Sequence, residues 1–185
     1  MSAAENAHTG AHAIAVARAA RVRLMIFDVD GVLTDGSLYY GPEGEVLKCF
    51  NVLDGHGIKL LQQSAVETAI ISARKSAIVQ RRAADLGITH VYQGVHDKRA
   101  AYELLLMQSA IGADACGFIG DDVIDLPVLS RVGFAVSVPN AHHEVLARAH
   151  YVTKAGGGRG AVREVCDFIL HAQGTYEAAL APYLA

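Results

Sequence analysis

The sequence predicts an α/β fold in which helices cover both faces of a doubly wound parallel sheet. Two observations lead to this prediction. Short, compact apolar runs alternate along the chain with longer segments whose apolar residues recur at helical spacing. Glycines follow several of the longer segments, as they commonly follow the ends of helices. Strand–helix alternation of this kind is typical of doubly wound sheets, whose sites lie at the carboxyl ends of the strands.

The predicted elements follow one another in a regular order. Strands are predicted in apolar runs at 23–29, 66–72, 89–93, 116–120, 133–138 and at the start of 150–174. Helices are predicted at 57–65, 75–87, 97–112 and 122–133, and a closing helix follows a glycine loop within 150–174. One segment breaks this rhythm, because residues 36–51 place β-forming residues on both sides of Gly-Pro-Glu-Gly. The prediction is therefore a Rossmann-like sheet with a β-hairpin flap.

A chain of 185 residues is most simply one domain with a full hydrophobic core. We expect this domain at 23–173, after a flexible N-terminal extension at 1–22 and before a C-terminal tail at 174–185. Hydrophobic residues make up 52% of the sequence and charged residues 19%, which is typical of a soluble globular protein.

Charge and cysteine content exclude several functional classes. The net charge of −3 provides no basic field for nucleic acid or a membrane surface. Neither a signal peptide nor a membrane-spanning segment is expected. The three cysteines form no CxxC pair, which favours a reduced protein in the cytoplasm.

Two groups of acidic residues follow predicted strands. Asp28 and Asp30 end the first strand and share one face of it, and Asp121, Asp122 and Asp125 follow a later strand. The two groups converge only if their strands are neighbours. Clustered carboxylates repel one another unless a cation lies among them, and oxygen ligands favour Mg²⁺. Either group alone is equally compatible with turns and helix caps.

Two further polar residues stand beside other predicted strands. Ser72 ends a strand, and its hydroxyl can donate a hydrogen bond to a phosphate oxygen. Lys98 stands at the start of the helix after the third sheet strand, where it supplies a compact positive charge. Together, the two acidic groups, the hydroxyl and the lysine favour an active site over a set of turns and caps.

With "DVDGV", Ser72, Lys98 and "GDDVID" in this order, the sequence resembles the haloacid dehalogenase (HAD) superfamily over residues 23–170. The resemblance implies a HAD-like fold and phosphate hydrolysis. It identifies Asp28 as the nucleophile that forms an aspartyl-phosphate, and Asp30 as the general acid and then the general base. Asp30, Ser72, Lys98 and Arg74 are the residues expected to bind substrate.

The same resemblance implies a magnesium site. Its ligands would be Asp28, the backbone carbonyl of Asp30, and Asp121. Asp122 and Asp125 would be supporting acids that orient these ligands.

The segments that follow the first and second motifs are short, and this limits which families of the superfamily the sequence can resemble. Most members of the superfamily insert a cap domain after the first or second motif, but residues 33–54 hold only the hairpin and residues 74–97 only a helix and a strand. No cap domain is therefore predicted. "FNVLDGHGIKLL", "LGITHVYQG" and "GGGRGAVREVCDFIL" resemble the capless 3-deoxy-D-manno-octulosonate 8-phosphate (KDO 8-phosphate) phosphatase family.

This narrower resemblance implies a phosphorylated sugar-acid substrate and a role in the supply of KDO for lipopolysaccharide. It also implies Mg²⁺ dependence and a homotetramer in which the hairpins meet around a four-fold axis. The C-terminal tail would reach a neighbouring site or add to the contact between subunits.

Arg74 bears on the choice of substrate. A related phosphatase of the nine-carbon 2-keto-3-deoxynononic acid 9-phosphate tends to carry glutamate there, so Arg74 favours the eight-carbon sugar acid. A solvated charge at a helix start is the alternative for Arg74, and Ala73 stands where the family usually has glycine. Two other functions stay open, the nine-carbon phosphatase and a non-catalytic assembly module of the same fold. A non-catalytic module would be expected to have lost catalytic residues. This sequence keeps all of them, which argues against the assembly module: Asp28, Asp30, Ser72, Lys98 and Asp121.

Overall fold

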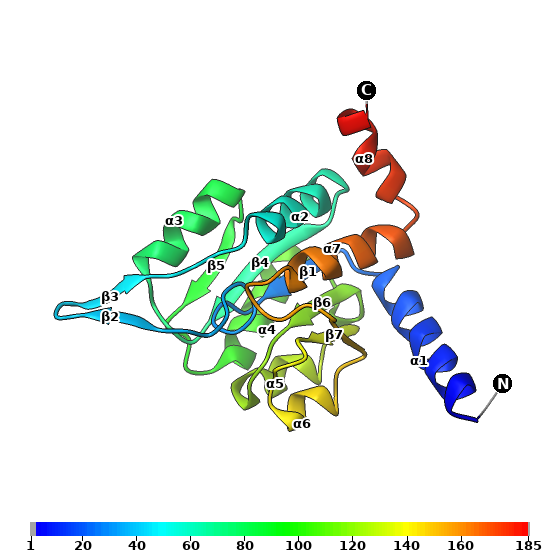
Figure 1. Ribbon diagram of the computed structural model, residues 1–185, viewed down its shortest axis with the longest axis horizontal. Helices are drawn as coiled ribbons and strands as arrows, with labels where there is room; N and C mark the ends of the chain where they lie inside the picture. The colour runs from blue at the N-terminus through cyan, green and yellow to red at the C-terminus, as the bar shows by residue number, and fades with distance from the viewer. Residues whose placement is uncertain (1–2, 185) are drawn as a thin grey trace.

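The computed structural model describes the backbone of residues 3–184 and the side chains of residues 10–184 (Figure 1). At its centre is a six-stranded sheet of order β5-β4-β1-β6-β7-β8, in which every neighbouring pair is parallel. Its strands are β1 (Leu24–Phe27), β4 (Glu67–Ser72), β5 (His90–Gln93), β6 (Cys116–Ile119), β7 (Phe134–Ser137) and β8 (Tyr151–Val152). The chain builds outward from β1 to β5, then returns and builds from β6 to β8. The predicted doubly wound sheet is confirmed, and its order reverses between β1 and β6.

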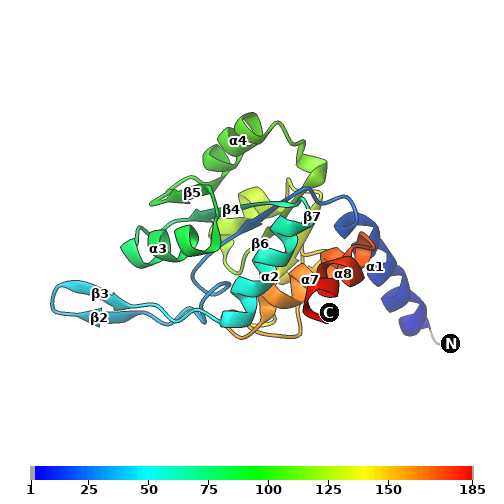
Figure 2. The same cartoon turned by 90° about the horizontal axis from the view of Figure 1, so that it is seen from above.

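Helices cover both faces of the sheet, which gives three layers (Figure 2). One face carries α1 (Ala3–Ala19), α2 (Val52–Gln63), α3 (Ala77–Leu86) and α7 (Ala161–Ala172). The other carries α4 (Lys98–Ser109), α5 (Leu126–Leu129) and α6 (His143–Leu146). A hydrophobic core lies on each face of the sheet, and alternate residues of β1 point into one or the other. Met25 and Phe27 pack on the first face, and Leu24 and Ile26 pack on the second. Because β1 is buried on both faces, its sequence is continuously apolar.

The predicted hairpin flap is confirmed. β2 (Tyr39–Gly41) and β3 (Gly44–Leu47) form a separate antiparallel sheet. This hairpin projects from one end of the molecule, whereas α1 and α8 (Tyr176–Leu184) lie at the other end (Figures 1 and 2). Within residues 3–184, no cap domain is inserted between the elements of the sheet.

The two terminal segments are helical where the structure describes them. The N-terminal extension, expected to be flexible, forms α1, and its residues Ala15 and Ala19 are buried in the core. The tail forms α8 beside α7. Residues 1, 2 and 185 of these segments lie outside the described residues. None of the described helices has the length and apolar character needed to cross a bilayer.

Two helices differ from their predicted extents. α2 begins at Val52 rather than at residue 57, because the Asn51 side chain caps it by accepting a hydrogen bond from the Leu53 N–H. The segment 122–133, predicted as one helix, is a 3₁₀ turn at Val123–Asp125 followed by the short α5. A reciprocal cap between Asp122 and Asp125 starts the turn there.

Candidate active site

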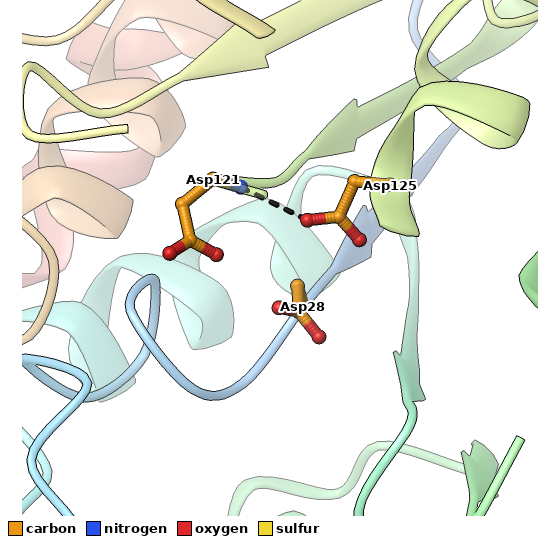
Figure 3. Close-up of side chains that lie close together, drawn as sticks. All are labelled: Asp28, Asp121 and Asp125. Carbon is orange, nitrogen blue, oxygen red and sulfur yellow. Dashed lines mark hydrogen bonds between the residues drawn. The ribbon is translucent and has the colours of Figure 1, made fainter. Parts of the chain in front are cut away.

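The predicted acidic groups meet where β1 and β6 end side by side. Phe27 of β1 lies opposite Ile119 of β6, so the residues that follow both strands emerge at the same edge of the sheet. A carboxylate oxygen from each of Asp28, Asp121 and Asp125 lies within 4.8 Å of the other two (Figure 3). The neighbouring parallel strands therefore bring together side chains that are far apart in the sequence.

Lys98 donates hydrogen bonds to two of these three carboxylates. It lies at the start of α4, which Asp97 caps, and its Nζ donates to Asp28 Oδ1 at 2.7 Å and to Asp125 Oδ1 at 2.5 Å. The other oxygen of Asp125 accepts the backbone N–H groups of Asp121 and Asp122 at 3.0 and 3.2 Å. Both oxygens of Asp125 are thus engaged in orienting its neighbours, which suits a supporting residue better than a ligand.

The cluster carries more negative than positive charge. Burial, and then the charge of Asp125, raise the pKa of Asp28 despite the opposing effect of Lys98. Burial together with Asp125 and Asp122 raises the pKa of Asp121 from 3.8 to about 7. Burial lowers the pKa of Lys98, but Asp28 and Asp125 outweigh burial and the net shift is upward. One ammonium group thus faces three carboxylates.

Asp121 shows where a further positive charge fits. Its Oδ1 is buried and has no hydrogen-bond partner among the described residues. A buried carboxylate oxygen without a partner is costly, and a cation between Asp28 and Asp121 removes that cost. An all-oxygen donor set fits a hard divalent cation such as Mg²⁺.

The remaining predicted residues lie around this cluster. Ser72 is buried at the end of β4, next to β1, where Phe27 lies opposite Ile70. Asp122 is exposed, and its carboxylate caps the turn that follows it rather than facing Asp28.

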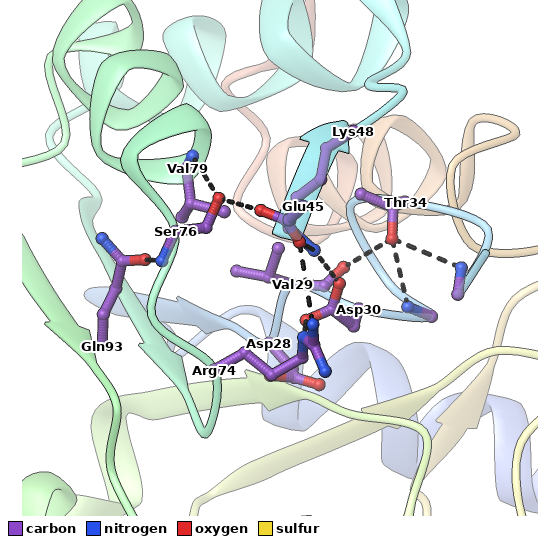
Figure 4. Close-up of polar contacts among 12 residues, drawn as sticks. Asp28, Val29, Asp30, Thr34, Glu45, Lys48, Arg74, Ser76, Val79 and Gln93 are labelled. Atoms are coloured by element: carbon purple, nitrogen blue, oxygen red, sulfur yellow. Dashed lines mark hydrogen bonds and ion pairs between the residues drawn. The ribbon is translucent and has the colours of Figure 1, made fainter. Parts of the chain in front are cut away.

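Asp30 belongs to a second charged group that includes the hairpin (Figure 4). Its Oδ1 accepts a hydrogen bond from Lys48, which directly follows β3, and its Oδ2 lies 3.8 Å from Arg74 Nε. Lys48 also pairs with Glu45 at 3.0 Å, and Arg74 donates a hydrogen bond to the Tyr40 hydroxyl. Arg74 therefore lies beside Asp30 and the hairpin.

Neither Lys48 nor Glu45 was predicted from the sequence as a site residue. They are opposite charges three residues apart, on either side of the exposed apolar residues Val46 and Leu47. The available signal was Lys48 itself, which is the single basic residue of the 36–51 hairpin segment. Its connection to Asp30 exists only in three dimensions.

A family model described as haloacid dehalogenase-like hydrolase matches residues 62–163, and this is the class of protein that the sheet and its strand-end carboxylates define. 3-Deoxy-D-manno-octulosonate 8-phosphate phosphatase KdsC of Escherichia coli (strain K12) is 51% identical over 164 residues, 89% of this chain and 87% of that protein. The crystal structure of the Yersinia pestis phosphatase of the same name has a TM-score of 0.87 and 51% identity, and covers 89% of each chain. The Moraxella catarrhalis phosphatase, crystallised with magnesium ion, phosphate ion and KDO, has a TM-score of 0.89 and 43% identity over 91% of this chain and 97% of that one. The chain belongs to the haloacid dehalogenase-like hydrolases and, within them, to the KDO 8-phosphate phosphatase family.

Proposed function

We propose that the chain is a Mg²⁺-dependent phosphatase that converts KDO 8-phosphate to KDO and inorganic phosphate, a step in the synthesis of lipopolysaccharide precursors. The observation that carries this proposal is the group of Asp28, Asp121 and Asp125 around Lys98, with the unpartnered Asp121 oxygen. The magnesium, phosphate and KDO bound by the Moraxella catarrhalis relative support the substrate class and the metal.

Mg²⁺ would be held by the carboxylates of Asp28 and Asp121 and by the backbone carbonyl of Asp30. When bound, the ion supplies positive charge that offsets the carboxylates and the phosphate. Asp125 and Lys98 keep Asp28 in a single orientation, because Lys98 joins both carboxylates.

In the first step, an oxygen of Asp28 attacks phosphorus and the bond between phosphorus and the sugar oxygen breaks. Asp30 gives its proton to that oxygen as it leaves, so the free sugar acid departs as an alcohol. Lys98 and the hydroxyl of Ser72 contact the phosphoryl oxygens. Asp28 then carries the phosphoryl group.

In the second step, the Asp30 carboxylate takes a proton from a water molecule, and the water oxygen attacks phosphorus. The bond between phosphorus and Asp28 breaks, inorganic phosphate is released, and both aspartates return to their starting states. Because one residue gives a proton and then takes one back, Asp30 has to be held beside the reacting oxygen in both steps.

Arg74 is the basis of the preference for the eight-carbon substrate. Its guanidinium lies beside Asp30 and the hairpin, and its side chain is 38% exposed, so it can meet an anionic or hydroxylated substrate at the edge of the site. The alternative substrate is the nine-carbon 2-keto-3-deoxynononic acid 9-phosphate.

Release of inorganic phosphate from the two sugar-acid phosphates, measured with Mg²⁺ and with a chelator, tests the proposal. We expect Mg²⁺-dependent hydrolysis with a higher kcat/KM for KDO 8-phosphate. A higher kcat/KM for the nine-carbon substrate would reassign the substrate, and no hydrolysis of either would support an assembly module instead.

We also propose that the protein forms a homotetramer and is located in the cytoplasm. The hairpin exposes large apolar side chains that contact with other subunits would bury: Leu38, Tyr39, Tyr40, Val46 and Leu47. The three free cysteines support a reducing compartment.

A further inference from the structure

The hairpin contributes one fully buried charge to the edge of the proposed site. Only 1% of the Lys48 side chain is exposed, although the apolar hairpin residues next to it are largely exposed. A lysine that only solubilised the hairpin would extend into water. Lys48 instead points inward to Asp30 (Figure 4).

Lys48 is itself held in place. Glu45 pairs with its Nζ at 3.0 Å, and the second oxygen of Glu45 accepts a hydrogen bond from the Ser76 hydroxyl. Ser76 caps the start of α3, and its backbone N–H donates to Gln93 Oε1 at 2.9 Å. A continuous chain of contacts therefore runs from the end of β5 to the Asp30 carboxylate through the hairpin.

The two oxygens of Asp30 have different surroundings. Oδ1 accepts the hydrogen bond from Lys48. Oδ2 accepts no hydrogen bond among the described residues, and its distance of 3.8 Å from Arg74 Nε is too long for one. Lys48 thus selects the orientation of the carboxylate and leaves one oxygen available for proton transfer.

We propose that Lys48 is a positioning residue for the hydrolysis: anchored by Glu45, it holds Asp30 Oδ1 so that Oδ2 exchanges the proton with the leaving group and with water. This inference rests on the proposed function and adds to it a role for the hairpin in the chemistry. Lys48 acts only through Asp30. Its effect on turnover therefore has to disappear when Asp30 can no longer transfer a proton.

A double-mutant cycle tests this dependence. Lys48→Met keeps the unbranched apolar stem of the buried side chain but removes the charged amino group. We expect kcat for KDO 8-phosphate to fall on the order of tenfold to a hundredfold, part of the full effect of a general acid–base group. KM should change far less. Adding Lys48→Met to Asp30→Asn should produce no further loss. Lys59→Met, which replaces an exposed lysine on α2, is the matched control and should keep wild-type kcat.

p-Nitrophenyl phosphate separates a positioning role from a general loss of structure, because its leaving group departs without a proton. In Lys48→Met, the first release of nitrophenolate should keep nearly its wild-type rate, and later turnovers should be slow, because the attack of water still requires Asp30. A burst is therefore expected. Equal slowing of both phases, or a rise in KM for KDO 8-phosphate at unchanged kcat, would overturn the proposal.

The experiments also separate a wrong substrate assignment, and a variant that does not fold, from a failure of the positioning role. If the wild-type protein hydrolyses p-nitrophenyl phosphate but not KDO 8-phosphate, the substrate assignment fails, while the burst still tests Lys48. If Lys48→Met does not fold, Glu45→Gln loosens Lys48 without removing it, and its smaller loss of kcat should also vanish in Asp30→Asn. Additive losses in either cycle would contradict the positioning role.

Discussion

At the scale of single residues, the site is defined by an imbalance of charge. Lys98 is shared between Asp28 and Asp125, and Asp121 keeps a buried oxygen without a partner. From the sequence, the two acidic groups were expected to converge only if their strands are neighbours, and β1 and β6 are neighbours in the sheet. The pairing of Asp30 with Lys48 could not be predicted from the sequence, because it depends on where the segment after β3 passes the residues that follow β1.

Asp28→Asn should abolish turnover and leave the protein folded. An amide cannot attack phosphorus, so we expect kcat to fall by at least about a thousandfold. The fold should persist because Lys98 keeps its contact with Asp125. Steady-state phosphate release and circular dichroism measure the two effects. Substantial Mg²⁺-dependent hydrolysis by the folded variant would contradict the mechanism.

Asp30→Asn should lower kcat about 10²- to 10⁴-fold, the usual contribution of a general acid–base group. It should retain Mg²⁺ binding, because the proposed ligand from this residue is its backbone carbonyl. Isothermal titration with Mg²⁺ and steady-state kinetics separate the two properties. Wild-type turnover would remove Asp30 from its acid–base role.

Without a divalent cation, stability should fall as the pH rises from 6 to 8. The pKa of Asp121 is raised from 3.8 to about 7 in the folded protein, and that of Asp28 is raised as well. The folded state thus keeps protons that the unfolded chain loses, so this stabilisation is fully present below pH 3.8 and is lost as the pH passes about 7.

Urea denaturation in a chelator at pH 6 and pH 8 measures this effect, with Asp121→Asn as the comparison. The variant should lose less stability over the same interval, and Mg²⁺ should stabilise the wild-type protein more at pH 8 than at pH 6. If the free energy of unfolding fell by the same amount in the wild-type protein and in Asp121→Asn, the proposed excess of buried negative charge would be contradicted.

At the scale of elements, a glycine loop supports the segment that carries Asp28 and Asp30. Gly158 N–H donates to the Val32 carbonyl, and a Cβ on Gly157 would lie 1.8 Å from the Gly31 carbonyl oxygen. From the sequence, this loop was placed before the closing helix, without a structural role of its own. The structure shows that it packs against the backbone after β1, a contact that no local pattern could predict.

Gly157→Ala should therefore destabilise the protein by about 1–3 kcal/mol, as overpacking commonly does, and should also lower kcat by displacing the 28–36 segment. Gly156→Ala is the matched control, because its new Cβ would lie 3.5 Å from the nearest atom, Asn140 Oδ1, which is an ordinary contact. Chemical denaturation and phosphate release measure both variants. Equal stability of the two would show that the loop tolerates a side chain at residue 157.

Whole elements were predictable to different degrees. The strands β1, β6 and β7 were recognised because each is a short apolar run that helices bury completely, and β4 is buried except at Glu67. Helices α1, α6 and α8 were not predicted: α6 is a single short turn, α1 is rich in alanine, and α8 has no buried residue. Their sequences lack the amphipathic pattern on which such a prediction depends.

At the scale of the whole molecule, the hairpin and the C-terminal tail lie at opposite ends (Figure 1). The aromatic ring of Tyr183 in α8 packs against His56 of α2, with ring centroids 5.3 Å apart. Within one chain, the tail is therefore remote from the hairpin end.

Analytical ultracentrifugation tests the assembly that we propose. We expect a tetramer for the full chain and for a chain that ends before Gly174, because the hairpin provides the main apolar contact. If the tail covers a neighbouring site, its removal raises KM or lowers kcat while the tetramer persists. A stable, fully active monomer would contradict the proposed assembly.

The most direct test of the central claim is to identify where the phosphoryl group resides during turnover. The protein is mixed with radiolabelled KDO 8-phosphate and Mg²⁺, quenched within the first turnover, digested, and mapped by mass spectrometry. The account predicts label on Asp28 in the wild-type protein and no label in Asp28→Asn, which lacks the nucleophile. Label on another residue, or full turnover without any labelled protein, would contradict it.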